Sequence, residues 1–244
     1  MWVKIYYLNS YLKKPRLLLK LSGGAVCGTE DIYSEQKLIS LAIQIRELSQ
    51  NYLIGIVIGG GNIWRGKEEK LSFLSVHERD YIGMISTVMN GFVLEKALKS
   101  LGVATKLFSA LEIERVTARY DITLIDKLIN SGEVLIFAGG LGEPQFSTDS
   151  AAIIRAIEIG ASQILIGKEG VSGIYNKDPN VFSDATFYSE LSYDQLIREN
   201  IQVLDQASLQ LAKKNNLKLL VFNQEVENCF IKALNREIPL SEVS

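Results

Sequence analysis

The chain has few of the residues that build metal centres, disulfide frameworks or nucleophilic triads. Its 244 residues include two cysteines and one histidine. Cys27 and Cys229 lie far apart and match neither a metal-ligand spacing nor a disulfide framework. With His77 as the single histidine, zinc chemistry and a Ser-His-Asp triad are both poorly supported. Reduced thiols, and with them a cytoplasmic location, are the simplest interpretation.

Long apolar runs and an excess of charge of one sign are also missing. No apolar run approaches the roughly 18–20 residues that a membrane helix needs. Residues 1–15 contain neither the apolar core nor the small-residue cleavage site of a signal peptide, and we interpret them as an extension. A net charge of −2 without a dense Lys/Arg tract gives no sign of a nucleic-acid surface. We therefore expect a globular chain that binds neither nucleic acid nor a membrane.

The most informative feature that is present is a glycine-rich turn after an apolar segment. Residues 54–58 are typical of a buried strand, and three consecutive glycines, Gly59 to Gly61, follow them. Glycine adopts positive φ at low cost and has no Cβ, so backbone N–H groups can close around an anion. Arg65, four residues further on, offers a planar charged fork to phosphate oxygens. A single turn of this kind is weak evidence, because many tight turns bind no ligand.

The same pattern occurs three more times along the chain. Apolar segments at 17–21, 134–137 and 164–166 each run into small residues, and Lys20 lies inside the first of them. Strands end in this way when their carboxyl ends line a ligand crevice. Any one of these segments is equally compatible with an ordinary strand-to-helix turn, but four together favour a nucleotide or phosphate site.

Strand-like and helix-like segments alternate over most of the length. The spacing of apolar residues predicts helices over 35–51, 84–101, 122–129, 150–159 and 206–215, and strands over 103–108 and 217–222. Thr148, Asp149 and Ser150 are good residues for opening the fourth helix, and Ser192 for starting one near 193. Such alternation predicts an α/β fold, a mostly parallel central sheet sandwiched by helices in three layers. Because the sequence has no low-complexity linker, we expect two lobes on one continuous sheet.

With these motifs the chain resembles the bacterial UMP kinases, a family within the amino-acid-kinase superfamily. The resemblance covers roughly residues 16–237. Its markers are Lys20-Leu21-Ser22-Gly23, Gly59-Gly60-Gly61-Asn62-Ile63-Trp64-Arg65-Gly66, Asp80-Tyr81-Ile82-Gly83-Met84, Thr87-Val88-Met89-Asn90-Gly91, Phe146-Ser147-Thr148-Asp149-Ser150-Ala151-Ala152, Asp178-Pro179, Val203-Leu204-Asp205 and Leu219-Leu220-Val221-Phe222-Asn223.

The resemblance implies transfer of the ATP γ-phosphoryl group to UMP, giving UDP for pyrimidine nucleotide biosynthesis, with Mg²⁺ accompanying ATP. It also implies a homohexamer that GTP activates and UTP inhibits. The implied organisation is an extension over 1–15 and one domain over 16–244, with a UMP lobe at 16–160 and an ATP lobe at 161–240. The sequence has no Walker G-x-x-x-x-G-K-[ST] run, so it is not a P-loop kinase.

Carried over residue by residue, the resemblance assigns the donor side first. Lys20 would lie along the bridging and γ-phosphate oxygens, and Arg65 would contact phosphate from its turn. Asp205 matches an acidic residue near the reaction centre, where a carboxylate can orient Lys20 or a magnesium-bound water. Lys20, Asp205 and Arg65 are thus the implied catalytic residues, and no residue is assigned as a metal ligand. The implied ATP-binding residues are Lys20, Leu21, Ser22, Gly23, Gly61, Arg65, Glu169, Tyr175 and Asp178, with a further backbone amide from Gly24.

On the acceptor side, Asp80 matches the residue that holds UMP through its ribose hydroxyls. The segment 141–148 would wrap the base and phosphate, with the Thr148 hydroxyl at a helix start. The implied UMP-binding residues are Gly60, Asp80, Leu141, Gly142, Glu143, Pro144, Gln145, Phe146, Ser147 and Thr148. Asp149 is left open between a role at the site and a helix cap.

Three residues depart from the family pattern, all on the ATP side. Ser172 stands where the family usually has Asp, Glu169 stands near the adenine where a small polar residue is usual, and Gly24 replaces a commoner Glu. Loss of one charge-assisted contact costs on the order of 1.5–3 kcal/mol, which weakens a catalyst without abolishing it. An alternative is therefore a uridine-nucleotide-binding regulatory paralogue with impaired catalysis. A sibling kinase for an amino acid or carbamate is a third possibility, against which Asp80 and the 141–148 segment argue.

Overall fold

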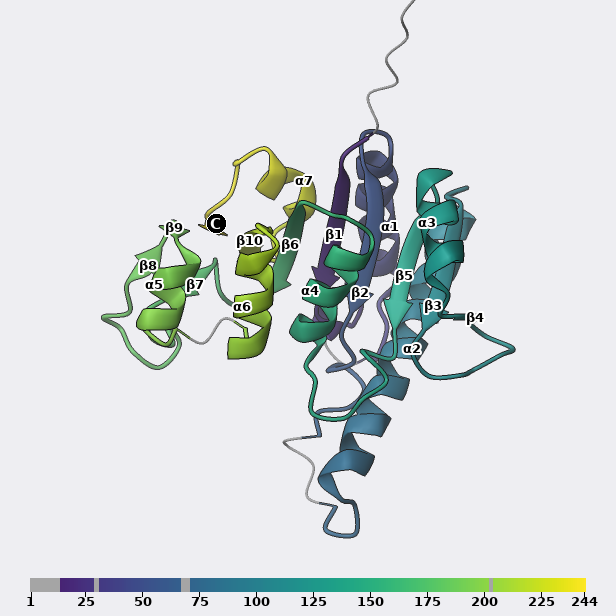
Figure 1. Ribbon diagram of the computed structural model, residues 1–244, viewed down its shortest axis with the longest axis horizontal. Coiled ribbons are helices and arrows are strands. Elements are labelled where there is room, and N and C mark those ends of the chain that lie inside the picture. Colours follow the sequence, from purple (N-terminus) through teal and green to yellow (C-terminus); the bar gives the residue numbers. More distant parts are fainter. Residues whose placement is uncertain (1–13, 29–30, 67–70, 202–203) are drawn as a thin grey trace, which may run out of the picture.

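The computed structural model describes residues 14–28, 31–66, 71–201 and 204–244 (Figure 1). Its main sheet has nine strands in the order β4-β3-β5-β2-β1-β6-β10-β11-β9. The only antiparallel pair among them in the described part of the chain is β10 with β11. The strands are β1 (Arg16–Leu21), β2 (Leu53–Ile58), β3 (Thr105–Ser109), β4 (Ala118–Arg119), β5 (Val134–Ala138), β6 (Gln163–Lys168), β9 (Glu190–Leu191), β10 (Lys218–Asn223) and β11 (Leu240–Val243); β7 (Ile174–Tyr175) and β8 (Phe187–Tyr188) form a separate hairpin.

Helices cover both faces of this sheet, which explains why its central strands are apolar along their whole length. Leu17 and Leu19 of β1 face one hydrophobic cluster, whereas Leu18 faces the other. The first cluster is covered by α1 (Glu35–Ser49), α2 (Val76–Ser100) and α7 (Cys229–Leu234); the second by α3 (Ile122–Asn130), α4 (Thr148–Glu158), α5 (Tyr193–Arg198) and α6 (Gln206–Lys214). The predicted α/β fold with a mostly parallel sheet between helical layers is confirmed.

Helix α2 begins eight residues before the predicted start at 84. A capping box at its first turn explains the difference, because the Ser75 side chain accepts from the Glu78 backbone N–H while Glu78 accepts from the Ser75 N–H at 2.7 Å. The polar run of residues 77–80 hid this turn from an argument based on apolar spacing. The extra length brings Asp80 onto the same helix as Thr87 and Asn90.

The cap of α4 also differs from the expectation. Ser147 is the N-cap, and its side chain accepts a hydrogen bond from the backbone N–H of Ser150 at 3.0 Å. The prediction that residues 148–150 cap this helix is therefore wrong by one residue. Asp149 is not the cap, so its carboxylate is available to other partners.

Three further outcomes concern unpredicted elements, residues outside the described ranges, and membrane-spanning helices. Helix α7, strand β11 and the short strands β4 and β7 to β9 were not predicted. Residues 1–13 of the predicted extension, and Val203 of the Val203-Leu204-Asp205 marker, lie outside the described residues. Among the described helices, none is both long and apolar enough to cross a membrane.

Candidate active site

The glycine-rich turns meet at the carboxyl edge of the sheet. Strand β1 is central and pairs with β2 on one side and β6 on the other, so that Lys20 lies in register with Val57 and Ile166. Strand β5 lies on the far side of β2. Because all four strands are parallel, the turns that follow them lie at one edge, as the sequence pattern predicted.

Two lysines and one aspartate form the charged centre of this edge. Lys20 Nζ lies 2.8 Å from Asp149 Oδ1, and Lys168 Nζ lies 3.1 Å from Asp149 Oδ2. The side chains of Lys20 and Asp149 are only 9% and 18% exposed. Burial acts to raise the pKa of the Asp149 carboxyl, but the two ammonium groups outweigh it and hold the pKa below its ordinary value. One carboxylate thus fixes two cations that end neighbouring strands.

Asp205 occupies a different place from the one expected for a partner of Lys20. It caps α6, where its carboxylate accepts from the Ser208 backbone N–H at 2.9 Å and from the Ser208 hydroxyl at 2.8 Å. It also accepts a hydrogen bond from the Ser150 hydroxyl, one residue after Asp149. Burial acts to raise the Asp205 pKa, but these hydrogen bonds leave it lowered. In this structure Asp149, and not Asp205, holds Lys20.

The first two glycine turns pack directly against each other. A Cβ on Gly23 would lie 2.7 Å from the backbone N of Asn62, so only glycine permits this approach. Asn90 of α2, which is fully buried, donates to the Gly59 carbonyl and to the Asn62 side chain, both at 2.7 Å. Leu21 has its side chain in the core, and its carbonyl accepts from the Gly59 N–H at 2.9 Å, so its backbone alone faces the turns.

The Glu169 carboxylate lies against the turn that follows β1. One of its oxygens accepts from the Gly24 backbone N–H at 2.9 Å and from the Ser22 hydroxyl. The other lies 3.7 Å from Arg65 Nη2, while Arg65 Nε donates to the Gly61 carbonyl at 3.0 Å. Gln224, just after β10, accepts from the Ser22 N–H at 3.1 Å. Glu169, which we expected beside an adenine, therefore contacts the predicted phosphate loop.

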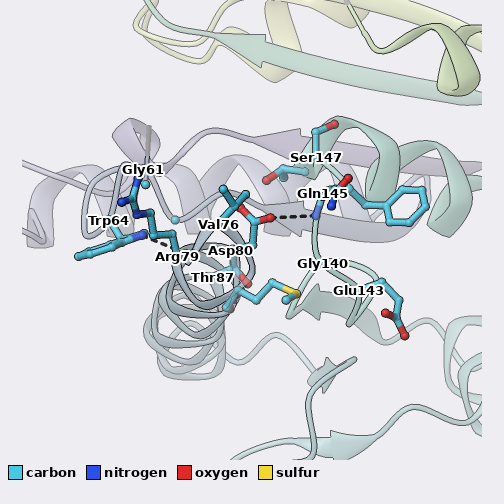
Figure 2. Close-up of a pocket in the computed structure, with 16 residues that line it drawn as sticks. Gly61, Trp64, Val76, Arg79, Asp80, Thr87, Gly140, Glu143, Gln145 and Ser147 are labelled. Carbon is cyan, nitrogen blue, oxygen red and sulfur yellow. Dashed lines mark hydrogen bonds between the residues drawn. The ribbon is translucent and has the colours of Figure 1, made fainter. Parts of the chain in front are cut away.

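A cavity of about 560 Å³ opens beside the Gly59–Gly61 turn (Figure 2). Its walls are α2 and the segment after β5, which come together where the Gln145 backbone N–H donates to Asp80 Oδ2 at 2.9 Å. Gly139, Gly140 and Gln145 have φ of +74°, +59° and +71°, which turns this segment back toward α2. The cavity-lining residues among those predicted for UMP are Gly60, Asp80, Glu143, Gln145, Phe146, Ser147 and Thr148; Leu141, Gly142 and Pro144 belong to the same segment without lining it.

A second cavity of about 560 Å³ lies on the other side of the charged centre and is lined by Lys168, Tyr175 and Asp178. Asp178 accepts from the Asn180 backbone N–H at 2.9 Å and from the Asn180 side chain at 3.1 Å, which forms a local turn. Ser172 is half-buried, and within the described residues its side chain makes no hydrogen bond. The predicted donor residues thus divide between this cavity and the loop at Ser22–Gly24 with its contacts Glu169 and Arg65, except that Gly61 lines the first cavity.

The sequence analysis gave no role at this site to four residues, Lys168, Gln224, Asn90 and Ser150, although Asn90 and Ser150 belong to the family markers. Lys168 had a usable signal, since it follows Gly167 at the end of an apolar segment, and Lys20 also lies near the end of one. The other three act through hydrogen bonds to loops, for which the sequence gives no periodic signal.

No metal cage accompanies these groups. Within the described residues, no set of three or more His, Cys, Asp or Glu side chains is placed to hold a metal ion. Both oxygens of Asp149 already contact ammonium groups.

The chain matches the amino acid kinase family over residues 15–223. It is 40% identical over 228 residues to a uridylate kinase of Mycoplasmoides gallisepticum, covering 93% of this chain and 97% of that protein. It is 42% identical over 228 residues to the uridylate kinase of Mycoplasma capricolum, covering 93% and 96%. Among solved structures it is similar to the UMP kinase of Ureaplasma parvum, with a TM-score of 0.91, 37% identity and coverage of 96% and 100%. The UMP kinase of Bacillus anthracis gives a TM-score of 0.87 at 32% identity, covering 94% and 95%.

Proposed function

The chain belongs to the uridylate kinases of the amino acid kinase family and is a phosphotransferase that converts UMP to UDP, and from this premise we propose how its own residues divide the work. The cavity at Asp80 binds UMP, and the cavity at Tyr175 and Asp178 binds the adenosine of ATP. The observation that supports this division is the position of the charged centre. Thr148, next to Asp149, lines the first cavity, whereas Lys168, which pairs with Asp149, lines the second.

Phosphoryl transfer needs in-line placement of donor and acceptor and neutralisation of charge on the migrating group more than it needs covalent chemistry. Lys20 supplies a cation between the two cavities, and Asp149 keeps its ammonium group in place. Lys168 supplies a second cation from the donor side. Gly23, Gly24 and Gly61 present backbone N–H groups to phosphate oxygens, and Arg65 adds its guanidinium.

Mg²⁺ fits this arrangement as a partner of ATP. Magnesium keeps several waters and takes one or two carboxylates together with substrate phosphates, so a three-carboxylate cage is not required. When bound, the ion neutralises the β- and γ-phosphate oxygens. Asp205 is the carboxylate that we propose to face a magnesium-bound water, since it accepts a hydrogen bond from the hydroxyl of Ser150, the residue that follows Asp149.

We also propose a homohexamer that GTP activates and UTP inhibits. Helix α2 supports assembly, because Tyr81, Ile85 and Met89 recur at i, i+4 and are 42%, 47% and 46% exposed. A stripe of large apolar side chains of this kind is typical of a subunit interface.

The test of the catalytic assignment is UDP formation from ATP and UMP with magnesium, with CMP as the control acceptor. UMP-selective turnover that disappears in Lys20→Ala, with UMP binding retained, supports the roles given to the two cavities. Saturable UMP binding without turnover, even with GTP present, would instead favour a catalytically impaired binder and make Ser172→Asp the next variant.

A further inference from the structure

Glu169 places a negative charge where the donor phosphates are expected. Its carboxylate accepts from the Gly24 N–H at 2.9 Å and from the Ser22 hydroxyl, and it faces Arg65 at 3.7 Å. A backbone N–H, a hydroxyl and a guanidinium are the groups with which proteins hold phosphate. The Glu169 carboxylate therefore occupies hydrogen-bond donors of this loop that could otherwise bind a phosphate group.

The absence of a side chain at residue 24 makes this contact possible. A Cβ on Gly24 would lie 2.6 Å from the Glu169 carboxyl carbon, so a larger residue at 24 and the observed position of Glu169 exclude each other. Gln224 Nε2 donates to the Ser22 hydroxyl, and that hydroxyl donates to Glu169, so the carboxylate completes a chain of hydrogen bonds across three strand ends.

The side chain can leave this position. It is 38% exposed, and Gly170, which follows it, has φ of +69° and no atom within 4 Å of the place where a Cβ would lie. Two anions cannot share the Gly24 N–H and the Ser22 hydroxyl, so phosphate oxygens reach those donors only when the carboxylate has moved.

From these contacts we infer that Glu169 is a positioning residue of the donor site, an internal anion that holds the Ser22–Gly24 loop in shape and is displaced by the ATP phosphates. The inference rests on the proposed function, which places the donor phosphates at this loop. Glu169 lowers the affinity for ATP and leaves the affinity for UMP unchanged, because the UMP cavity does not include it.

The experiment measures binding of the non-hydrolysable β,γ-imido analogue of ATP by calorimetry, with magnesium and with EDTA, together with the KM values for ATP and UMP. Glu169→Gln, which keeps the shape and removes the charge, is expected to tighten analogue binding about tenfold under both conditions. The KM for ATP falls with it, and the KM for UMP does not change. Glu169→Ala gives the same direction.

Glu225→Gln is the matched control. Glu225 is a neighbouring carboxylate that accepts from the Gly170 N–H at 3.1 Å, so the variant changes the local charge equally without touching the Ser22–Gly24 loop. We expect it to change analogue binding by less than about twofold. Equal effects of the two variants would mean general electrostatics and would overturn the inference.

Two other results overturn it. Unchanged binding in Glu169→Gln means that the carboxylate does not compete with phosphate. Weaker binding confined to the magnesium condition means that it serves the ATP–metal complex instead. Lys20→Ala separates these failures from failure of the proposed function. If analogue binding changes in neither Lys20→Ala nor Glu169→Gln, the donor phosphates bind elsewhere and the proposed function of this loop fails as well.

Discussion

Asp149 is the residue on which the charged centre depends. Asp149→Asn keeps the size of the side chain but removes the negative charge that Asp149 places between the ammonium groups of Lys20 and Lys168 at a largely buried position. We expect kcat to fall about a hundredfold, the order found for loss of a preorganised electrostatic contact. The free energy of unfolding should fall on the order of 3 kcal/mol.

The control for this variant is Asp126→Asn. Asp126 pairs with Arg16 at 3.6 Å, and its side chain is 66% exposed, so the same substitution is made at a solvent-exposed ion pair. Steady-state kinetics and urea denaturation of both variants test the prediction. An Asp149→Asn enzyme as active and stable as the control would contradict the role given to Asp149.

The lowered pKa of Asp149 also predicts a pH dependence of stability. Because the folded-state pKa lies below the ordinary value of 3.8, the ionised carboxylate stabilises the folded state fully at pH values above the unfolded pKa. That contribution is lost as the pH falls through the folded pKa. The difference in unfolding free energy between the wild type and Asp149→Asn should therefore be constant from pH 7 to about 5 and should shrink below about pH 4. A difference that grows on acidification would show that the sign is wrong.

At the scale of single residues, the sequence predicted which residues belong to the site better than it predicted which contacts they make. Lys20, Asp80 and the glycines could be found because a charge or a glycine at a strand end is a local pattern. Whether Asp149 would cap α4 or pair with Lys20 depended on a shift of two residues in the cap, from Asp149 to Ser147, which local composition does not determine. Lys168 and Gln224 were missed for a related reason, since their partners, Asp149 on α4 and Ser22 after β1, belong to other elements of the fold.

Helix α2 is the element that connects the two glycine turns. Asn90 donates to the Gly59 carbonyl, and Thr87 Oγ1 accepts from the Gly139 N–H at 2.7 Å while donating to the Met84 carbonyl. One rigid helix thus sets the distance between the turn after β2 and the turn after β5. Both turns line the cavity proposed for UMP.

Thr87→Val tests this connection. Valine matches threonine in shape but leaves the buried Gly139 N–H without an acceptor, which costs about 1–3 kcal/mol. We expect the KM for UMP to rise several-fold while the KM for ATP changes little. Thr123→Val, on the exposed first turn of α3, is the control and should leave both constants unchanged. An equal rise of both KM values would point to a general loss of folding.

The elements were predictable where burial on both faces makes a strand continuously apolar, as in β1, β2, β5 and β6. Their exact ends were less predictable, because caps such as Ser75 and Ser147 act through single hydrogen bonds. The last elements, α7 and β11, are short, and β11 pairs antiparallel with β10 only after the chain has returned across α7. No local period in the sequence marks such a return.

At the scale of the whole molecule, the exposed stripe on α2 is the feature that one chain leaves without a partner. Tyr81, Ile85 and Met89 lie on the side of the helix that faces away from the core residues Leu94 and Leu98. The proposed occupant is a second copy of this chain, since in a homo-oligomer with two-fold symmetry the same stripe meets itself. Because Asp80, Thr87 and Asn90 belong to α2 as well, assembly through this helix would also hold the UMP cavity in shape.

Ile85→Arg tests assembly and its consequence together. The substitution places a charge in the middle of the stripe, where like charges from two copies would meet, and should shift the mass in analytical ultracentrifugation from an oligomer toward the monomer. Val181→Arg is the control, because Val181 is 70% exposed and lies outside α2. If α2 is stabilised by its partner, the dissociated Ile85→Arg variant should also bind UMP more weakly, whereas binding of the ATP analogue, which uses β1, β6 and the second cavity, should persist. A wild-type chain that sediments as a monomer would remove the oligomer proposal, and an Ile85→Arg monomer with unchanged UMP affinity would show that α2 supports the cavity without help from a neighbour.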